Sequence, residues 1–174
     1  MIRLHWATSL FLIVLGGCGS IHGPFGIGTQ PAPPTYEQWH KPGATKIEVK
    51  KALLECGEPS TVRDTHIYEK VLGLKDPDEL QNHFFLVEHC MEESGFIVPG
   101  TKTTAEYCSW DRHRHLPACQ PQTPLQKRSI ERRMNSWYCK IKTDQEYCRK
   151  NSFRPAACND PHRSFNTPPP ECLP

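Results

Sequence analysis

Residues 102–119 read KTTAEYCSWDRHRHLPAC, and residues 142–158 read KTDQEYCRKNSFRPAAC, which is a similar segment starting 40 positions later. Both share K-T-x-x-E-Y-C, an arginine six residues after that cysteine, and a final Ala-Cys. A threonine followed three residues later by glutamate is a capping box, here Thr103–Glu106 and Thr143–Glu146. We expect each copy to begin a short helix and to return through a loop to its second cysteine. The repeat therefore predicts two disulfides, Cys108–Cys119 and Cys148–Cys158.

The composition indicates a small domain that needs covalent cross-links. Of the 174 residues the first 17 resemble an export signal, and Leu, Ile, Val and Phe make up only 27 of the remaining 157. Lys and Arg number 21 against 19 Asp and Glu, so nothing indicates a general affinity for nucleic acid. A core this poor in apolar residues, with nine cysteines, is typical of exported domains that depend on disulfides. We expect a mostly α, small, disulfide-rich domain with little β structure, and neither a cytosolic enzyme nor a multi-span membrane protein.

The N-terminus has the features of a lipoprotein signal. Residues 1–17 carry a basic start at Arg3 and an apolar run over residues 6–15, which is too short to span a bilayer. The sequence Leu15-Gly16-Gly17-Cys18 resembles the bacterial lipobox. That resemblance implies cleavage before Cys18 and acyl chains such as palmitate on it. Position 19 lacks the aspartate that retains such proteins in the inner membrane, so the resemblance implies the outer membrane. The alternative is an ordinary signal peptide with Cys18 in a disulfide.

The rest of the chain divides into segments by composition. A capping box at Thr45–Glu48 predicts a helix over about residues 46–56, and Asp76 before Pro77 predicts another over about 77–93. Residues 96–98 are a candidate short strand. The predicted segments are a signal peptide (1–17), the lipidated cysteine and a flexible tether (18–38), a helical pair (39–100), two cysteine-loop repeats with a helix between them (101–160) and a Pro-rich tail (161–174).

The helix between the repeats is the candidate binding surface. It is expected to open at Thr123-Pro124-Leu125-Gln126, with an inner side formed by Leu125, Ile130, Met134 and Trp137. Its outer side concentrates four positive charges in seven residues, and these are Lys127, Arg128, Arg132 and Arg133. Such a face suits an anionic partner, which we expect to be an envelope protein, lipopolysaccharide or a glycan strand. The alternative is a helix face that only keeps the protein soluble.

Three resemblances to lipoproteins extend the prediction. W-x-K-P-G-A-T at residues 39–45 and C-M-x-x-x-G at residues 90–95 resemble a group of short, often prophage-borne bacterial lipoproteins, and this resemblance implies a Cys56–Cys90 disulfide. Cys139–Cys172 then follows by elimination. Residues 137–138 with Cys148, Asn151, Cys158 and Asn159 are weakly similar to conjugative entry-exclusion lipoproteins. The run Gly43, Thr45, Val49, Gly57 and Pro59 is weakly similar to BamE-like lipoproteins of outer-membrane assembly.

These patterns favour a protein that acts by binding. No pair of cysteines has the two-to-four-residue gap of a zinc knuckle, and the sequence contains no Gly-x-Ser-x-Gly, phosphate-binding loop or His-Glu-x-x-His. We expect no metal, no cofactor and no catalytic residue. The leading prediction is a non-enzymatic binding or structural module, attached to the membrane by its N-terminal lipid and facing the periplasm or the cell surface. The alternatives are a phage superinfection or conjugative entry-exclusion factor and a BamE-like assembly accessory, and an envelope enzyme comes third.

Overall fold

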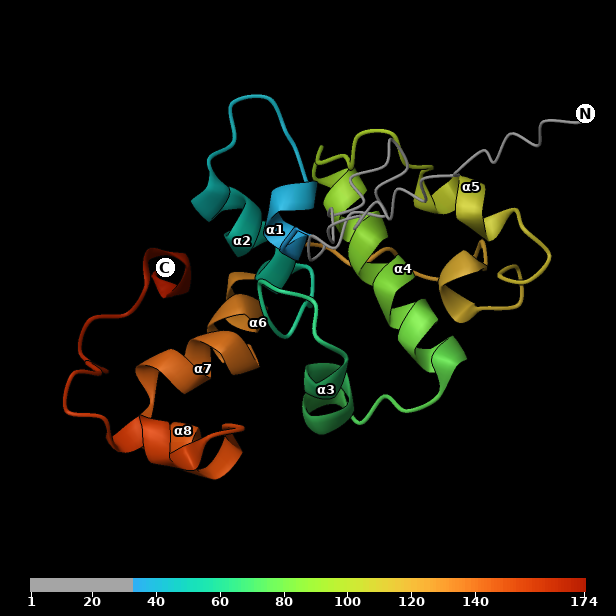
Figure 1. The fold of residues 1–174 in the computed structure, drawn as a ribbon. Helices are drawn as coiled ribbons and strands as arrows, with labels where there is room; N and C mark the ends of the chain where they lie inside the picture. Colours follow the sequence, from blue (N-terminus) through green and yellow to red (C-terminus); the bar gives the residue numbers. More distant parts are fainter. Residues whose placement is uncertain (1–32) are drawn as a thin grey trace, which may run out of the picture. The chain divides into compact units, whose positions relative to one another are not determined.

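The computed structural model describes residues 33–174, and there the chain is mostly helical (Figure 1). The expected mostly α, disulfide-rich fold is confirmed. Within this range the β-type pairing is one isolated antiparallel bridge between His40 and Ile97, where a short strand was a candidate. The signal peptide, Cys18 and most of the expected tether lie outside the described residues.

The helices are short, with one exception. The α-helices are α1 (Thr35–Gln38), α2 (Lys46–Glu55), α3 (Thr65–Ile67), α4 (Pro77–Glu93), α5 (Thr104–Cys108), α6 (Ile130–Asn135), α7 (Trp137–Thr143) and α8 (Gln145–Asn151). A π-helix, η1 (Tyr68–Leu72), follows α3, and the 3-10 helices are η2 (Pro117–Cys119), η3 (Pro155–Asn159) and η4 (Pro170–Cys172).

The helices α2 and α4 begin at the signals that the sequence contains. The Thr45 hydroxyl accepts the Glu48 N–H, and the Glu48 carboxylate accepts the Thr45 N–H, so the predicted capping box is present. The Asp76 carboxylate caps α4, and Pro77 is its first residue. These local hydrogen bonds satisfy N–H groups that a helix start leaves unpaired. Both helices are confirmed, with α2 ending one residue before the predicted 56.

In residues 33–174 the hydrophobic interior is divided into four clusters, and each contains one disulfide. The largest lies between α2 and α4 around Cys56–Cys90, and the other three are built around Cys108–Cys119, Cys139–Cys172 and Cys148–Cys158. All four pairs are the predicted ones. A small cluster buries little apolar surface, so the cross-link supplies part of the stability that a single large core would give. The main cluster comprises Trp39, Val49, Ala52, Leu53, Cys56, Val87, Cys90, Met91 and Phe96.

The predicted helix between the repeats is wrong in its bounds and in its inner side. Residues 123–129 are not helical, and Ser129 caps α6 instead. The backbone of Ser136, with ψ of 149°, leaves the helical region, and its hydroxyl accepts the Cys139 N–H to start α7. The helix is therefore broken into two. Leu125 and Ile130, which were expected to face inward, are 48% and 57% exposed.

The two repeats start differently. In the first copy Thr103 and Glu106 form the predicted capping box of α5. In the second copy the predicted box is wrong, because Thr143 is the last residue of α7 and its hydroxyl donates to the Cys139 carbonyl. The next residue, Asp144, caps α8 instead and accepts the Tyr147 N–H. A residue with a helical backbone cannot also be the extended residue at a helix start.

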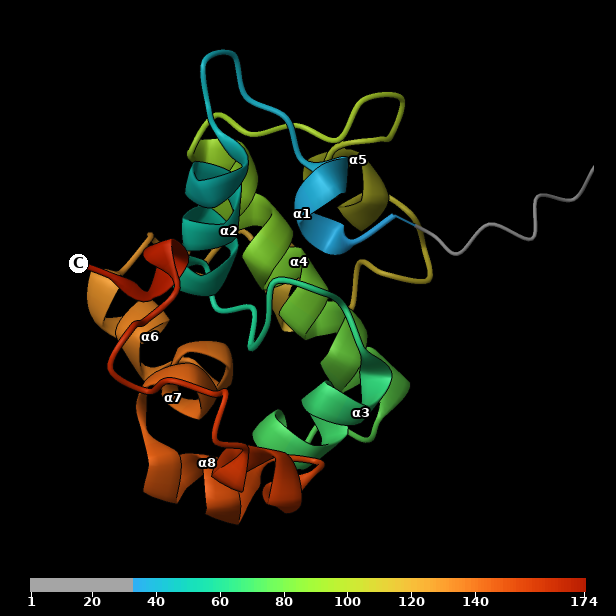
Figure 2. The same ribbon diagram turned by 60° about the vertical axis from the view of Figure 1, so that its left-hand side comes forward.

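The domain extends further at both ends than the sequence indicates. Residues 35–38, assigned to the tether, form α1, and the buried Thr35 hydroxyl accepts the Arg63 N–H at 2.7 Å. Residues 161–174, assigned to a tail, include η4, where Glu171 and Cys172 are buried. In Figure 2 this C-terminal segment, drawn in dark red, returns to the neighbourhood of α2 and α6. The terminal residues are therefore part of the packed structure.

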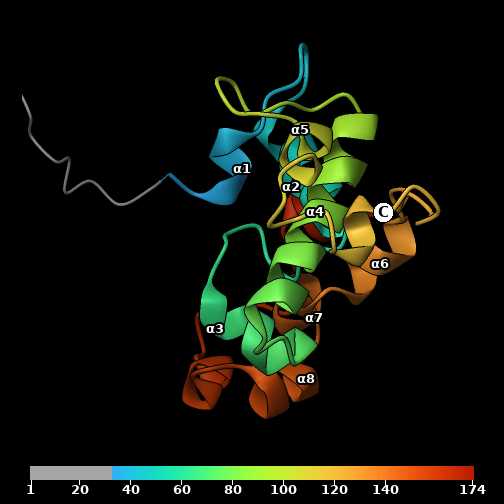
Figure 3. The same cartoon turned by 90° about the vertical axis from the view of Figure 1, so that its right-hand side faces the viewer.

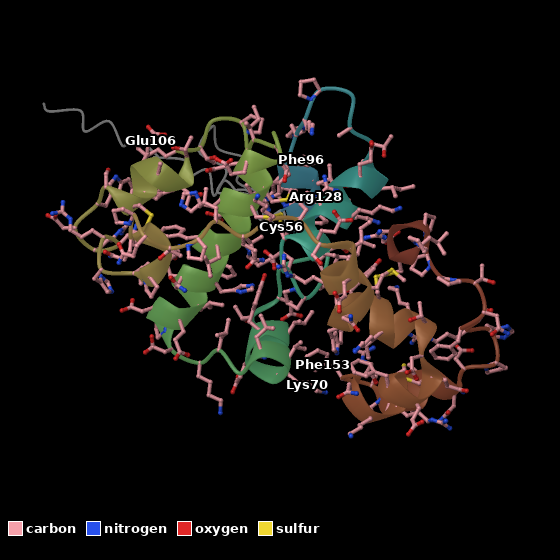
Figure 4. All side chains as sticks on the ribbon, turned by 180° about the vertical axis from the view of Figure 1, so that it is seen from behind. Cys56, Lys70, Phe96, Glu106, Arg128 and Phe153 are labelled. Atoms are coloured by element: carbon pink, nitrogen blue, oxygen red, sulfur yellow. A yellow bond between two sulfur atoms is a disulfide. The ribbon has the colours of Figure 1, made fainter. Side chains whose placement is uncertain are left out.

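The helices α3 and η1 approach the second cysteine loop, and Figure 3 shows them next to α8. The Lys70 ammonium donates to the Ser152 carbonyl at 2.9 Å and lies 4.4 Å from the centre of the Phe153 ring (Figure 4). This contact joins the segment between α2 and α4, which the sequence left unassigned, to the second repeat.

Candidate functional site

Three of the four basic residues predicted to form one exposed face gather around Glu55 in the structure. Arg133 is 1% exposed, and its Nε lies 2.9 Å from Glu55 Oε1. The Nε of Arg128 lies 2.6 Å from Glu55 Oε2. Arg132 donates to the backbone carbonyls of Glu55 and Lys127. The prediction of an exposed basic face is therefore wrong for Arg133, which is buried, whereas Lys127 and Arg128 are exposed. Glu55, the last residue of α2, engages three of the four side chains.

Arg133 joins three distant segments of the chain. Besides Glu55, its guanidinium donates to the carbonyls of Glu171, at 2.7 Å, and Leu173. A buried guanidinium has to place its N–H groups on acceptors, and here two of them are carbonyls of the C-terminal segment. The residue predicted to bind a partner therefore holds α2, α6 and the C-terminus together.

A buried polar cluster lies between the end of α2 and α4. The Glu58 carboxylate, 1% exposed, accepts the Tyr68 hydroxyl at 2.5 Å and the Arg63 guanidinium at 3.3 Å. The same guanidinium lies 3.5 Å from Glu88 Oε1 and 4.1 Å from the Phe84 ring centre. We name Glu58, Arg63, Tyr68 and Glu88 the Arg63 cluster. It carries one cation and two carboxyl groups.

Burial controls the protonation behaviour of this cluster. Burial raises the pKa of the Glu58 carboxyl, and Arg63 and the Tyr68 hydroxyl oppose the increase. Burial also raises the pKa of Glu88, again against Arg63, and raises the pKa of the Tyr68 hydroxyl together with the Glu58 charge. The neighbouring His83 has its pKa lowered to about 4, first by burial and then by the Arg63 charge. His83 is therefore neutral at pH 7, and its Nε2 is buried without a hydrogen-bond partner in residues 33–174.

A cavity of about 140 Å³ lies beside the Arg63 cluster and is lined by Arg63, Glu88 and Glu92, among others. Glu92 accepts the backbone N–H and the hydroxyl of Thr104, at 2.9 and 3.1 Å. Glu88 faces Arg63, so the two α4 carboxylates that line this cavity, Glu88 and Glu92, are both engaged by neighbouring elements. This arrangement ties α5 and the residues after α2 to α4, and the charged side chains beside the cavity are engaged by one another and by Thr104.

A more open groove of about 400 Å³ follows the first cysteine loop. Phe85 of α4 and Tyr107 of α5 are stacked at its base, and the ring of His113 packs edge-on against Phe85. The same histidine ring is stacked on Trp110 and bonded through Nδ1 to the Tyr107 carbonyl at 3.0 Å. Tyr107 therefore belongs to the hydrophobic cluster of the Cys108–Cys119 disulfide and, together with His113, lines the groove.

The sequence indicates neither the Arg63 cluster nor the pairing of Arg133. Glu58 directly follows Gly57, and nothing in its neighbours predicts a buried carboxylate.

Within residues 33–174 no group of three His, Cys, Asp or Glu side chains is placed to hold a metal ion. In the same part of the chain no helix combines the length and the apolar character needed to cross a membrane. Comparison with protein-family models, with curated proteins and with solved structures finds no match.

Proposed function

We propose that this chain is an outer-membrane lipoprotein whose acyl chains are attached to Cys18. In this proposal residues 33–174 form a non-enzymatic binding or structural module of the cell envelope. The observation that carries it is the pairing of the cysteines. The eight cysteines of the described residues form four intramolecular disulfides, and the sequence contains nine. No cysteine of residues 33–174 is therefore left to pair with Cys18.

The disulfides also favour export. Such bonds persist in oxidising compartments and are rare in the cytosol. In this chain each hydrophobic cluster contains one of them, so reduction would affect every part of the interior. A domain built in this way needs to fold after transport, which agrees with the signal peptide that residues 1–17 resemble.

The length of chain before the first helix fits attachment to a membrane surface. Cys18 and Thr35, the first residue of α1, are separated by residues 19–34. A fully extended chain of this length reaches at most about 60 Å. The folded module would therefore stay within that distance of its lipid anchor, near enough to act on molecules of the membrane surface or of the adjacent envelope.

Binding is a better description of the module than catalysis. The acidic and basic groups of the Arg63 cluster, and those around Glu55, are bonded to one another and to backbone groups. The larger concave regions, such as the groove beside the Cys108–Cys119 loop, are open. Open grooves are suited to recognition of an extended partner.

Replacing Cys18 with alanine tests the anchor. Wild-type protein is expected in the outer-membrane fraction with the mass of acyl chains on its N-terminal peptide, and Cys18→Ala is expected to lose both properties because the acyl chains supply the membrane affinity. Gly19→Asp should move the protein to the inner membrane, since aspartate at this position retains lipoproteins there, and Ser20→Ala is the neutral control. An unmodified Cys18 in wild-type protein, with unchanged fractionation of Cys18→Ala, would contradict the proposal.

A further inference from the structure

The C-terminal part of the chain contains a cleft. Its lining does not include Lys127, Arg128, Arg132 or Arg133. The cleft has a volume of about 520 Å³ and lies between the end of α7 and the segment after η3. Its polar lining consists of Lys142, Asp160, His162, Arg163, Ser164 and Thr167. Two cations and two hydroxyl groups therefore face the same open space from separate segments.

Lys142, in the last turn of α7, has no acidic partner. Its Nζ lies 4.8 Å from the centre of the Tyr138 ring, and within residues 33–174 no ion pair involves it. The nearby Glu171 carboxylate is engaged by the Tyr138 hydroxyl at 2.5 Å and by Lys50 at 3.5 Å. Burial, and next the charge of Arg163, lower the pKa of Lys142. Its charge is thus partly desolvated, and in residues 33–174 it forms no ion pair with a carboxylate.

Arg163 is held in position by the backbone. Its guanidinium donates to the Ile141 carbonyl at 2.9 Å, and its carbon Cζ lies 5.2 Å from the centre of the Phe165 ring. A guanidinium has five N–H donors, so this bond leaves most of them available. No ion pair is found for Arg163 in the described part of the chain either.

The remaining lining groups add donors and one negative charge. The hydroxyls of Ser164 and Thr167 lie 3.4 Å apart at the cleft. The Asp160 carboxylate accepts the backbone N–H of His162 at 2.9 Å, and it thereby organises the turn and offsets one of the two cations. Counting Lys142, Arg163 and Asp160, the lining carries a net charge of plus one.

We propose that this cleft binds a phosphate ester, with Lys142 and Arg163 as the two cationic contacts and Ser164 and Thr167 as hydroxyl donors. A phosphate group offers several charged acceptor oxygens and forms its strongest hydrogen bonds with guanidinium and ammonium donors. The volume accommodates the group that carries the phosphate, either a sugar or a phospholipid headgroup. The inference deepens the proposed function, on which it rests, by naming the ligand chemistry of the binding module.

Titration of the full chain, purified from the envelope in neutral detergent, tests this site. Isothermal titration with glucose 6-phosphate represents sugar phosphates, and titration with glycerophosphoglycerol represents phospholipid headgroups. Wild-type protein should bind at least one of the two, and the affinity should fall as sodium chloride is added. Lys142→Gln and Arg163→Gln should each weaken binding about tenfold, which corresponds to the loss of one charge-assisted hydrogen bond.

The control for charge is Arg149→Gln, because Arg149 is exposed on α8 and does not line the cleft. Mapping of the four disulfides shows whether each variant has folded. Binding of acetate as strong as that of the phosphate esters, absence of binding to both esters, or equal affinities of Lys142→Gln and Arg149→Gln would overturn the proposal. Because binding is measured in solution, its failure is separate from a failure of the anchor, which the mass of the N-terminal peptide reports.

Discussion

Replacing Arg133 with methionine should cause a large loss of stability. Methionine keeps an unbranched side chain at the position but removes the guanidinium. The substitution leaves Glu55 Oε1 and the carbonyls of Glu171 and Leu173 without this donor. These acceptors come from α2 and from the C-terminal segment, so the change affects the packing of both on α6.

The magnitude follows from burial. Removing one partner of a buried ion pair costs about 3–5 kcal/mol, because the other charge stays buried. In Arg133→Met the Glu55 carboxylate keeps one cationic partner, because Arg128 Nε lies 2.6 Å from Glu55 Oε2. The lower end of this range therefore applies, and the expected loss of stability is about 3 kcal/mol. For a domain of this size such a loss lowers the melting temperature by about 6–12 °C.

Urea unfolding followed by circular dichroism, with the disulfides intact, measures this loss. Arg149→Met is the matched control, because Arg149 is exposed, and its free energy of unfolding should change by less than about 0.5 kcal/mol. If Arg133→Met cost no more than this control, Arg133 would not hold the three segments together. The interpretation of an exposed binding residue would then regain support.

Three further changes test other parts of the structure. The pKa of His83 is lowered to about 4, so between about pH 4 and 6.5 the unfolded chain binds more protons than the folded one. The stability is therefore complete above this window and falls as the pH decreases through it. In urea unfolding, His83→Leu should remove about 2 kcal/mol of the stability that wild-type protein loses between pH 7 and pH 4.5. Replacing Cys139 and Cys172 together with serine opens a disulfide of sequence separation 33 and should cost up to about 4 kcal/mol, with faster proteolysis of the C-terminal segment as a second measurement. Gly57→Ala should cost about 1–3 kcal/mol in thermal unfolding, because the φ of Gly57 is +107° and a new Cβ would lie 2.8 Å from Gln126 Nε2; an unchanged melting temperature would contradict this strain.

The features that the sequence predicts well are those whose physical cause is local. The start of α4 depends on Asp76 and Pro77, which are adjacent, and its observed bounds agree with the predicted ones. The Cys108–Cys119 and Cys148–Cys158 disulfides close short loops, so the repeat alone indicates their partners.

The features that the sequence predicts poorly depend on partners far away in the chain. From the sequence alone, Arg133 resembles an exposed charged residue on a helix. Its burial depends on Glu55, which is 78 positions away in the chain and accepts its Nε–H. Ser136 divides the predicted helix because its hydroxyl accepts the Cys139 N–H and so caps a new helix. A serine within an apolar periodic pattern does not by itself indicate that it will end one helix and start another. Glu58 is buried because Tyr68 and Arg63 supply its hydrogen bonds, which no local pattern requires.

Mass spectrometry of the protein from the envelope, digested without reduction, tests the central claim most directly. We predict an N-terminal peptide that begins at Cys18 and carries acyl chains. We also predict four cross-linked pairs, which are Cys56–Cys90, Cys108–Cys119, Cys139–Cys172 and Cys148–Cys158. A peptide in which Cys18 is joined to any of these cysteines, or an N-terminus without lipid, would contradict the claim.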